Sequence, residues 1–542
     1  MGQKIQFTLA FDESLEAYLQ SQYPDMIDFH ILSESLDARG ASLGKKPKIH
    51  YQVELGLTNS PLGVSEEKFP NLGPLSGNLP IIIGSGPAGL FCALRLSEYS
   101  IPSLILERGV AASERMHHIS RYWRYGQLDE DSNVCYGEGG AGLFSDGKLI
   151  TRIKSSYVDY VMKTFVDLGA PAEIRYLSNP HLGSNKIRQI ISSLTQILIK
   201  RNCQIRYKTK VTELIFENKK VVGVILASGE KIYSSHVILA TGHSAGEIYQ
   251  HLNTQNVSMK QKDFAVGVRI EHKRRYMDTL QYGNFAQDNK LGAARYRLSY
   301  ESPQDKKGIY TFCMCPGGHV LSSGTQRDGI VVNGMSNFAR NSPWSNSAVV
   351  VTIKAGVDFA AKNLLAGLDF QRDIEKKAFK ISSKLASGRE IPALTVKEFL
   401  QKKIQRSMSQ LPKSSTPSGI FRANMEEIFP PFVVNHLREG LMKFDQKLPG
   451  FSGGESLLLA PETRTSAPVT ILRDKETLMS LSHQGLYPCG EGAGYAGGIT
   501  SAAVDGIKVA MSLIKSEKNF SPHLLPTKSD HDGATDPPWF AD

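Results

Sequence analysis

Residues 81–96 read Ile-Ile-Ile-Gly-Ser-Gly-Pro-Ala-Gly-Leu-Phe-Cys-Ala-Leu-Arg-Leu: an apolar run, a glycine-rich turn and an apolar helix. Gly84 permits the tight turn, Gly86 lets the backbone approach a pyrophosphate, and Gly89 lets the helix pack closely on the strand. The phosphates would lie on free N–H groups at the positive end of the helix dipole. The stretch therefore predicts a dinucleotide site that comprises Gly84, Ser85, Gly86, Pro87, Ala88 and Gly89.

A second apolar run, Ser103–Leu106, ends in an acidic residue about twenty residues after the turn. At this position a carboxylate accepts from a ribose hydroxyl. Glu107 and its neighbour Arg108 therefore belong to the predicted cofactor site.

Residues 137–142 also fit the Gly-x-Gly-x-x-Gly pattern, but a polar loop, Asp129–Asn133, precedes them instead of a strand. This context disfavours a second Rossmann turn. Two interpretations stay open: backbone lying against a flat ligand such as a flavin, or a plain loop. The first makes Gly139, Gly140, Gly142, Leu143 and Phe144 cofactor contacts.

Two further strand ends carry small residues. The apolar run 237–242 stops at Ala-Thr-Gly, which lets Thr241 and Gly242 approach a cofactor at the carboxyl edge of the sheet. Residues 485–499 are glycine-rich and precede an apolar-faced helix predicted over 500–514. Here an acidic residue can accept from a ribityl chain, and the helix N-terminus can face the pyrimidine edge of a flavin. The predicted contacts are Gly490, Glu491, Gly498 and Ile499.

The bulk composition limits the function classes. The chain has 542 residues, a net charge of +10 and 41% hydrophobic residues, which indicates an ordinary globular protein of more than one domain. The basic residues form short clusters, which favours solvated faces and an anionic cofactor over nucleic acid. No apolar run is long enough for a membrane span, no spacing suggests a metal, and six scattered cysteines fit a reducing cytoplasm.

We expect an α/β fold: a Rossmann-type FAD-binding domain, an inserted α+β substrate domain and a small N-terminal α+β domain. The predicted limits are 1–75 for the N-terminal domain, 76–250 and 456–518 for the FAD-binding domain, 251–455 for the insertion and 519–542 for a disordered tail. Within the insertion, residues 350–365 and 398–404 are expected to be helical, whereas 264–270 and 329–332 are expected to be strands.

With these elements assembled, the chain resembles a large family of bacterial and plastid FAD-dependent dehydrogenases, or NAD(P)/FAD-dependent oxidoreductases, of the two-dinucleotide-binding-domain class. The resemblance covers roughly residues 1–515, and the motifs that carry it are Asp37–Arg39, the Gly84 turn, 137–148, 264–272, 312–318, 333–336, 462–466 and 490–505. It implies FAD as cofactor and a backbone contact from Val211 to the adenine. The family's Gly-Thr-Asp after a Pro-His pair is replaced here by Gly183-Ser184-Asn185, so no acid–base role is expected of that position.

Three residues are candidates for chemistry. Cys313 and Cys315 are either a redox pair or two small apolar residues beside a turn. Arg464 either clamps a substrate carboxylate or forms a structural ion pair. His181, His243 and His319 are interpreted as hydrogen-bonded loop residues in preference to general bases.

The leading hypothesis is an FAD-dependent enzyme, an oxidoreductase that transfers hydride between an unidentified small molecule and flavin N5. NAD(P)H is a candidate transient donor, because the chain has only one credible Rossmann turn. The alternatives are a flavin-dependent RNA-modifying protein and a non-catalytic FAD-binding sensor. The sequence leaves the substrate, the electron acceptor and the oligomeric state open.

Overall fold

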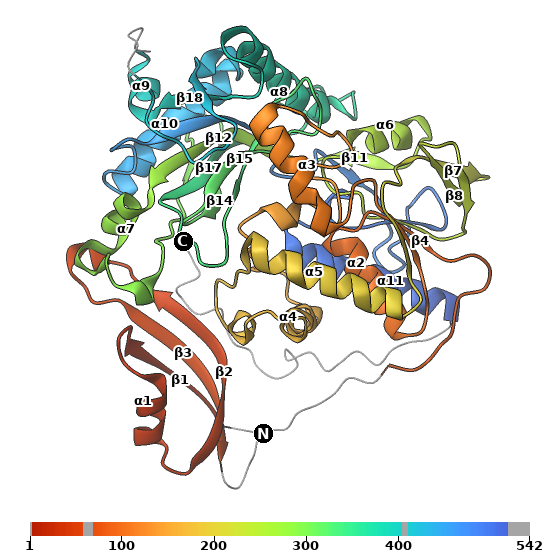
Figure 1. The fold of residues 1–542 in the computed structure, drawn as a ribbon, viewed down its shortest axis with the longest axis horizontal. Helices are drawn as coiled ribbons and strands as arrows, with labels where there is room; N and C mark the ends of the chain where they lie inside the picture. Colours follow the sequence, from red (N-terminus) through yellow and green to blue (C-terminus); the bar gives the residue numbers. More distant parts are fainter. Residues whose placement is uncertain (1–2, 58–68, 404–409, 519–542) are drawn as a thin grey trace.

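The computed structural model of the chain describes residues 3–57, 69–403 and 410–518. The predicted disordered tail, 519–542, lies outside the described residues, as does the last residue of the helix predicted over 398–404. Figure 1 shows a small N-terminal unit beside two larger bodies.

The N-terminal unit is an antiparallel sheet covered by one helix, as expected. Its strands pair in the order β1-β3-β2, and Leu19 of the helix packs against Val53 and Leu55 of the central strand. The unit touches helix α7 of the larger part through the short turn η1. Its elements are β1 (Gln3–Ala10), α1 (Leu15–Gln22), β2 (Met26–Asp37), η1 (Ala41–Leu43) and β3 (Lys48–Leu57).

A parallel sheet in the order β22-β10-β4-β5-β6 forms the Rossmann-type body. The central strands are apolar and fully buried because helices cover the sheet, which is typical of parallel sheets. The strands are β4 (Ile81–Ile83), β5 (Leu104–Leu106), β6 (Gln204–Arg206), β10 (Val237–Leu239) and β22 (Leu486–Pro488). A three-stranded meander is added by β7 (Val211–Glu217), β8 (Lys220–Leu226) and β9 (Lys231–Tyr233).

Helices from distant parts of the sequence pack together on this sheet (Figure 1). The last long helix, α11, lies against the first, α2, and α4 and α5 complete the layer. The bounds are α2 (Pro87–Glu98), α3 (Ala112–Tyr125), η2 (Ala141–Phe144), α4 (Tyr157–Asp167), η3 (Ala172–Arg175), α5 (Gly183–Lys200), α6 (Gly246–Thr254) and α11 (Ile499–Lys518).

The second body is a mixed sheet of seven strands in the order β13-β14-β17-β12-β20-β18-β19. Figure 1 shows α8 and α10 above its strands, and their apolar faces build a second core with β12 and β17. The strands are β12 (Phe264–Lys273), β13 (Ser299–Glu301), β14 (Gly308–Cys315), β17 (Trp344–Ile353), β18 (Ile391–Thr395), β19 (Ile420–Arg422) and β20 (Leu457–Glu462).

Shorter elements connect these strands. The two-stranded pairs are β11 (Met259–Gln261) with β21 (Val469–Ile471) and β15 (His319–Ser322) with β16 (Val332–Met335). The helices are α7 (Arg274–Tyr282), η4 (Gly283–Phe285), η5 (Asn289–Leu291), α8 (Ala366–Leu385), α9 (Val396–Gln401), η6 (Met425–Glu427) and α10 (Pro431–Lys447).

The helix predicted over 350–365 is wrong: residues 344–353 form strand β17, paired with β12 and β14. The reason is the run Val349–Val351, whose β-branched side chains favour a strand buried on both faces. Strand β20 pairs with β12 and β18, so residues 457–462 belong to the sheet of the predicted substrate domain. We therefore propose that the insertion ends after Glu462 instead of at residue 455.

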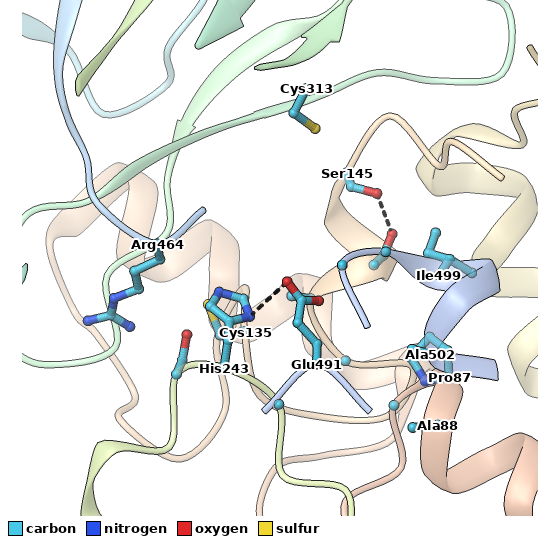
Figure 2. A pocket seen from close by; sticks show the side chains of 18 of the residues that line it. Pro87, Ala88, Cys135, Ser145, His243, Cys313, Arg464, Glu491, Ile499 and Ala502 are labelled. Atoms are coloured by element: carbon cyan, nitrogen blue, oxygen red, sulfur yellow. Dashed lines mark hydrogen bonds and ion pairs between the residues drawn. The ribbon is translucent and has the colours of Figure 1, made fainter. Parts of the chain in front are cut away.

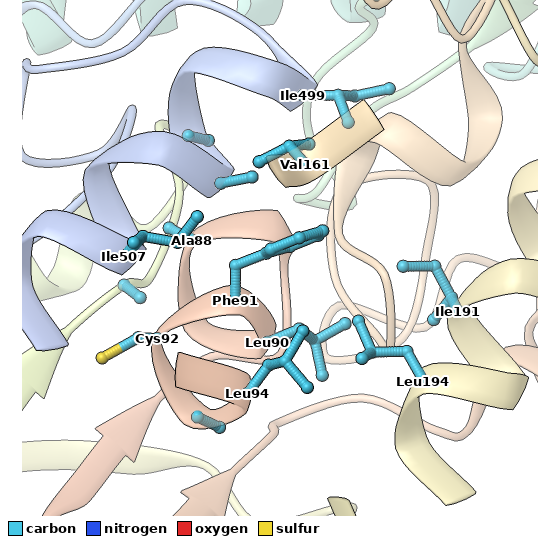
Figure 3. Packing of buried hydrophobic residues seen from close by; sticks show 14 of the residues in the cluster. Ala88, Leu90, Phe91, Cys92, Leu94, Val161, Ile191, Leu194, Ile499 and Ile507 are labelled. Atoms are coloured by element: carbon cyan, nitrogen blue, oxygen red, sulfur yellow. The ribbon is translucent and has the colours of Figure 1, made fainter. Parts of the chain in front are cut away.

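Helix α2 packs closely against α11 in the Rossmann-type body (Figure 3). A Cβ added to Gly506 of α11 would lie 2.1 Å from the carbonyl oxygen of Ala88 and 3.1 Å from the amide nitrogen of Cys92. Both neighbours are helix backbone, which gives way only if the helices separate.

We expect Gly506→Ala to lower the free energy of unfolding by about 1–3 kcal/mol, because overpacking forces backbone shifts. Urea unfolding without added cofactor measures this, and Gly497→Ala, whose new Cβ meets open space, is the matched control. Equal stabilities of the two variants would contradict the packing.

Candidate functional site

A cavity of about 410 Å³ lies at the carboxyl ends of β4 and β10, between the two large bodies (Figure 2). Half of the predicted cofactor contacts meet there. Those that line the cavity are Gly86, Pro87, Ala88, Gly140, Gly142, Thr241, Gly242, Glu491, Gly498 and Ile499. The opposite wall comes from the second body and includes Phe312, Cys313, Asn333, Glu462 and Arg464.

A smaller cavity of about 40 Å³ continues from the first and shares Tyr136 and Thr241 with it. Its lining contains four more of the predicted contacts, Gly84, Glu107, Arg108 and Val211. Arg108 lies over the Tyr136 ring and forms ion pairs with both Asp131 and Glu247. Arg108, Tyr136 and Glu247 form part of the smaller cavity's lining. Ser85, Gly89, Gly139, Leu143, Phe144 and Gly490 line neither cavity.

The Glu107 carboxylate is buried and already accepts several hydrogen bonds from the chain. One oxygen accepts from the backbone N–H and the hydroxyl of Ser85, at 2.9 and 2.8 Å. The other accepts from the N–H groups of Gly109 and Gly137, both at 2.9 Å. Glu107 therefore joins the first glycine turn to the second glycine segment in addition to its predicted role at a ribose.

The second glycine segment is a turn that leads into η2, with no preceding strand, as its sequence context predicts. Its conformation depends on Arg115 of α3, which is fully buried. Arg115 donates to the carbonyl oxygens of Gly137, Glu138, Gly140, Asn133 and Val134. Sequence reasoning missed this residue because nothing marks it among the charged residues of an amphipathic helix.

The third glycine segment is fixed by a buried ion pair between Arg473 and Asp505 of α11. Asp505 also accepts from the N–H of Gly490 at 2.7 Å, and Arg473 donates to the carbonyl oxygen of Pro488 at 2.7 Å. The turn that carries Glu491 is thus held to the helix whose N-terminus ends the segment. Sequence reasoning assigned no role to either residue: Asp505 ends the 490–505 motif, but nothing in the sequence pairs it with Arg473.

Buried arginine–carboxylate pairs hold the opposite wall. Arg269 on β12 makes a two-point contact with Glu462 on β20, at 2.5 and 3.1 Å. Arg464 makes a similar contact with Glu375 of α8, at 2.9 and 2.8 Å, and its third nitrogen donates to Thr325. For Arg464 this geometry supports the structural ion pair over the substrate clamp, although the side chain still reaches the cavity.

The two cysteines of the wall differ in access. Cys313 lines the cavity and has a positive φ of 46°, at a bulge between β14 and β17, whereas Cys315 is fully buried. A hydrogen bond from the Cys315 thiol, with the charges of Lys148 and Arg269, holds the pKa of Cys313 well below its ordinary value. Both thiols are free.

Glu491 and His243 face each other in the cavity, with Oε1 and Nδ1 3.9 Å apart (Figure 2). Burial raises the pKa of Glu491 to about 7. Burial and the nearby charge of Arg464 lower the pKa of His243 to about 4. Both side chains are therefore neutral between about pH 4 and 7. His181 bonds the Phe338 carbonyl oxygen instead, and neither His181 nor His319 lines the cavity.

Comparisons with known proteins identify the family of the chain. The family described as FAD-dependent protein, C-terminal domain-like, matches residues 263–465, and that of glucose inhibited division protein A matches residues 170–274. An uncharacterized protein of Clostridium beijerinckii (strain ATCC 51743 / NCIMB 8052) is 40% identical over 436 residues, 80% of each chain. The chain belongs to this family of FAD-dependent proteins.

The solved structures that match this chain are distant from it. CtdE in complex with FAD is 11% identical, with a TM-score of 0.30, over 82% of this chain and 86% of that one. Glycine oxidase from Bacillus cereus ATCC 14579 is 11% identical, with a TM-score of 0.31, over 81% of this chain and 98% of that one.

The residues around the cavities fit FAD, the family's cofactor. Gly242, Gly497 and Gly498 face open space, where an added Cβ would meet no atom within 4 Å. The N-terminus of α2 has no side-chain cap, so the N–H groups of Ala88 and Gly89 are available to a pyrophosphate. Glycines and the uncapped N-terminus of α2 thus border the space on the side of the Rossmann-type body.

No helix among residues 3–57, 69–403 and 410–518 has the length and apolar character of a membrane span. The same ranges contain no group of three or more His, Cys, Asp or Glu side chains that could hold a metal ion.

We expect Arg115→Met to weaken FAD binding at least tenfold, because the glycine segment loses its five backbone contacts. Titration of the FAD-free protein, followed by flavin fluorescence, measures the effect. Arg121→Met, an exposed change on the same helix, is the control and should bind like the unchanged protein. Equal FAD affinities of the two variants would contradict the role of Arg115 in holding the second glycine segment.

Protonation of Glu491 makes the free energy of unfolding depend on pH. Because the pKa of Glu491 is raised to about 7 in the folded chain, the folded state retains a proton that the unfolded state has lost above about pH 4.5. Stability from this group is thus present at low pH and lost as pH rises toward 7. We expect Glu491→Gln to remove this fall, as measured by urea unfolding at several pH values. Parallel curves for variant and unchanged protein would contradict the raised pKa.

Proposed function

We propose that this chain is an enzyme that transfers a hydride between a small-molecule substrate and flavin N5. The observation that carries the proposal is the shared cavity, whose floor is built by the dinucleotide turn and whose opposite wall is built by the second sheet. A substrate enclosed between the two bodies would be shielded from water and held beside the cofactor. Bound flavin supplies the two-electron chemistry.

The chain's own residues divide the work. The turn at Gly86–Ala88 and the Gly140–Gly142 segment would hold the phosphates and the ring, and the first turn of α11, which begins at Ile499, would present N–H groups to the pyrimidine edge of the ring. Glu491 holds a proton near neutral pH at its carboxyl, so below about pH 7 it can donate a hydrogen bond to a polyol and above it only accept.

Arg464 and Glu462 are each held by a buried partner, so they keep the substrate-facing wall in place. We propose that Cys313 shapes this wall together with Cys315, and that hydride passes directly to the flavin. The full burial of Cys315 at the end of β14 supports this assignment. We also propose a reducing compartment, the cytoplasm, because six cysteines are scattered along the chain and free.

The test is anaerobic titration of the FAD-loaded chain with NADPH, then NADH, followed by absorbance at the flavin bands. We expect one of these donors, or a reductant from a pool of small metabolites, to bleach the flavin, and a small-molecule acceptor to restore it. A flavin that is bound tightly but that no donor reduces would contradict the proposal and favour a sensor.

Cys313→Ser combined with Cys315→Ser is the companion variant. The rate of flavin reduction in this variant should stay within about threefold of the rate in the unchanged protein. Such a change corresponds to less than about 1.4 kcal/mol in activation free energy. A loss of a hundredfold or more would assign a dithiol exchange step instead. A salt-dependent copurifying RNA would favour the RNA-modifying alternative.

A further inference from the structure

A second cavity of about 1180 Å³ adjoins the flavin cavity. The two share Lys148, Ile150, Phe312 and Cys313, which therefore lie where the two cavities meet. Its volume is larger than the roughly 300–1,000 Å³ of most small-molecule sites. We refer to it as the basic cleft.

The lining of the basic cleft is strongly positive. It contains Lys148, Arg152, Arg295, Arg297, Arg340 and Lys447, against the single carboxylate of Glu301. Among the described residues, Arg340 is the only one of these cations that forms an ion pair with a carboxylate, that of Asp146. A cavity lined by one sign of charge concentrates ligands of the opposite sign.

The other cations are held loosely or point to solvent. Lys447 donates to the carbonyl oxygen of Ser299 at 2.5 Å, and Lys148 donates to that of Met314. Arg152 and Arg297 are exposed, and the described part of the chain supplies no hydrogen-bond acceptor to either guanidinium. These two side chains are free to meet an incoming anion.

A buried donor at the cleft also lacks a partner. Arg340 is 6% exposed, and its Nη1 atom is buried with no acceptor, although Nε and Nη2 bond Asp146. A buried donor left without an acceptor is costly, so sites of this kind are completed by a ligand or water. Arg340 and Cys313 both adopt positive φ, at 47° and 46°, and strain of this kind gathers at functional sites.

The cleft follows strand β14 from one end to the other. Residues 308–314 all line it, and the span from Gly308 to Cys313 corresponds to about 17 Å. The cations follow this length: Arg295 precedes Tyr296, whose N–H lies 3.2 Å from the sulfur of Met314, and Lys447 reaches Ser299, which pairs with Tyr310. The positive charges thus line the cleft along the strand that ends at the flavin cavity.

Aromatic rings accompany the charges. Tyr310 and Phe312 are two residues apart on β14 and so project from the same face. Both rings are partly buried and pack against Ala265, Ala348 and Val350. A planar ring can stack on such side chains, as bases do on tyrosine and phenylalanine.

We propose that the basic cleft binds an elongated, phosphate-bearing redox cosubstrate, with its phosphates on Arg152, Arg297 and Arg340 and its planar reacting end at Phe312 and Cys313. This inference rests on the proposed hydride transfer, since it names the class of molecule that exchanges electrons with the flavin. Two sources share the chemistry: a nicotinamide dinucleotide phosphate, or a smaller phosphorylated substrate.

The test measures binding without turnover. The FAD-loaded full chain is titrated by calorimetry with oxidised NADP⁺, NAD⁺ and pyrophosphate, which leave the flavin oxidised. We expect NADP⁺ to bind at least tenfold more tightly than NAD⁺, and its affinity to fall as salt rises from about 20 to about 200 mM, because exposed charges are screened.

The informative variant is Arg152→Gln with Arg297→Gln, which should weaken that binding at least tenfold. Its control is Arg275→Gln with Lys384→Gln, which removes the same charge from exposed positions outside the cleft and should bind normally. The chain could also bind pyrophosphate but not NADP⁺. If that binding is lost in the first variant and kept in the second, the result supports a smaller phosphorylated substrate as the source.

If neither NADP⁺ nor pyrophosphate distinguishes the two variants, the cleft is not an anion site and the inference is overturned. That result would leave the proposed function intact provided that another donor still reduces the flavin. Conversely, a chain that binds NADP⁺ at these arginines but never undergoes flavin reduction contradicts the proposed function and not the anion site.

Discussion

Close approach of backbone at the first glycine turn is the constraint on which the site depends. A Cβ on Gly89 would lie 2.0 Å from the carbonyl oxygen of Gly84, and one on Gly140 would lie 3.2 Å from the Cα of Gly86. With Gly506 of α11 against Ala88, three segments from distant parts of the sequence meet at this turn. Because backbone cannot rotate away as a side chain can, their relative positions are fixed before any cofactor arrives.

Charged residues then hold what the glycines bring together. Glu107 joins the first glycine turn to the second glycine segment, whereas Arg115 holds the second segment and Asp505 holds the third through hydrogen bonds to backbone. On the opposite wall, Arg269 and Arg464 each pair with a buried glutamate. Buried pairs of this kind add little net stability, but removal of one partner leaves an uncompensated charge, so they fix geometry strictly. The cavity is therefore a preorganised space between two bodies.

Local signals in the sequence predicted the strand–turn–helix, the parallel sheet and the family. They failed where tertiary contacts decide. The run from Val349 to Val351 forms a strand because two partner strands flank it. Arg115 acts through backbone far along the chain, and the cations of the basic cleft come from segments that only the fold assembles. A motif within one segment of the sequence does not reveal contacts with distant segments.

The most direct test of the cavity as the flavin site is a crystal structure of the chain with FAD bound. The flavin ring is predicted to lie between the Gly140–Gly142 segment and the N-terminus of α11, with Cys313 on the opposite side and the pyrophosphate at Gly86. Electron density for FAD in any other part of the molecule, or a ring turned away from Ile499, would contradict the assignment.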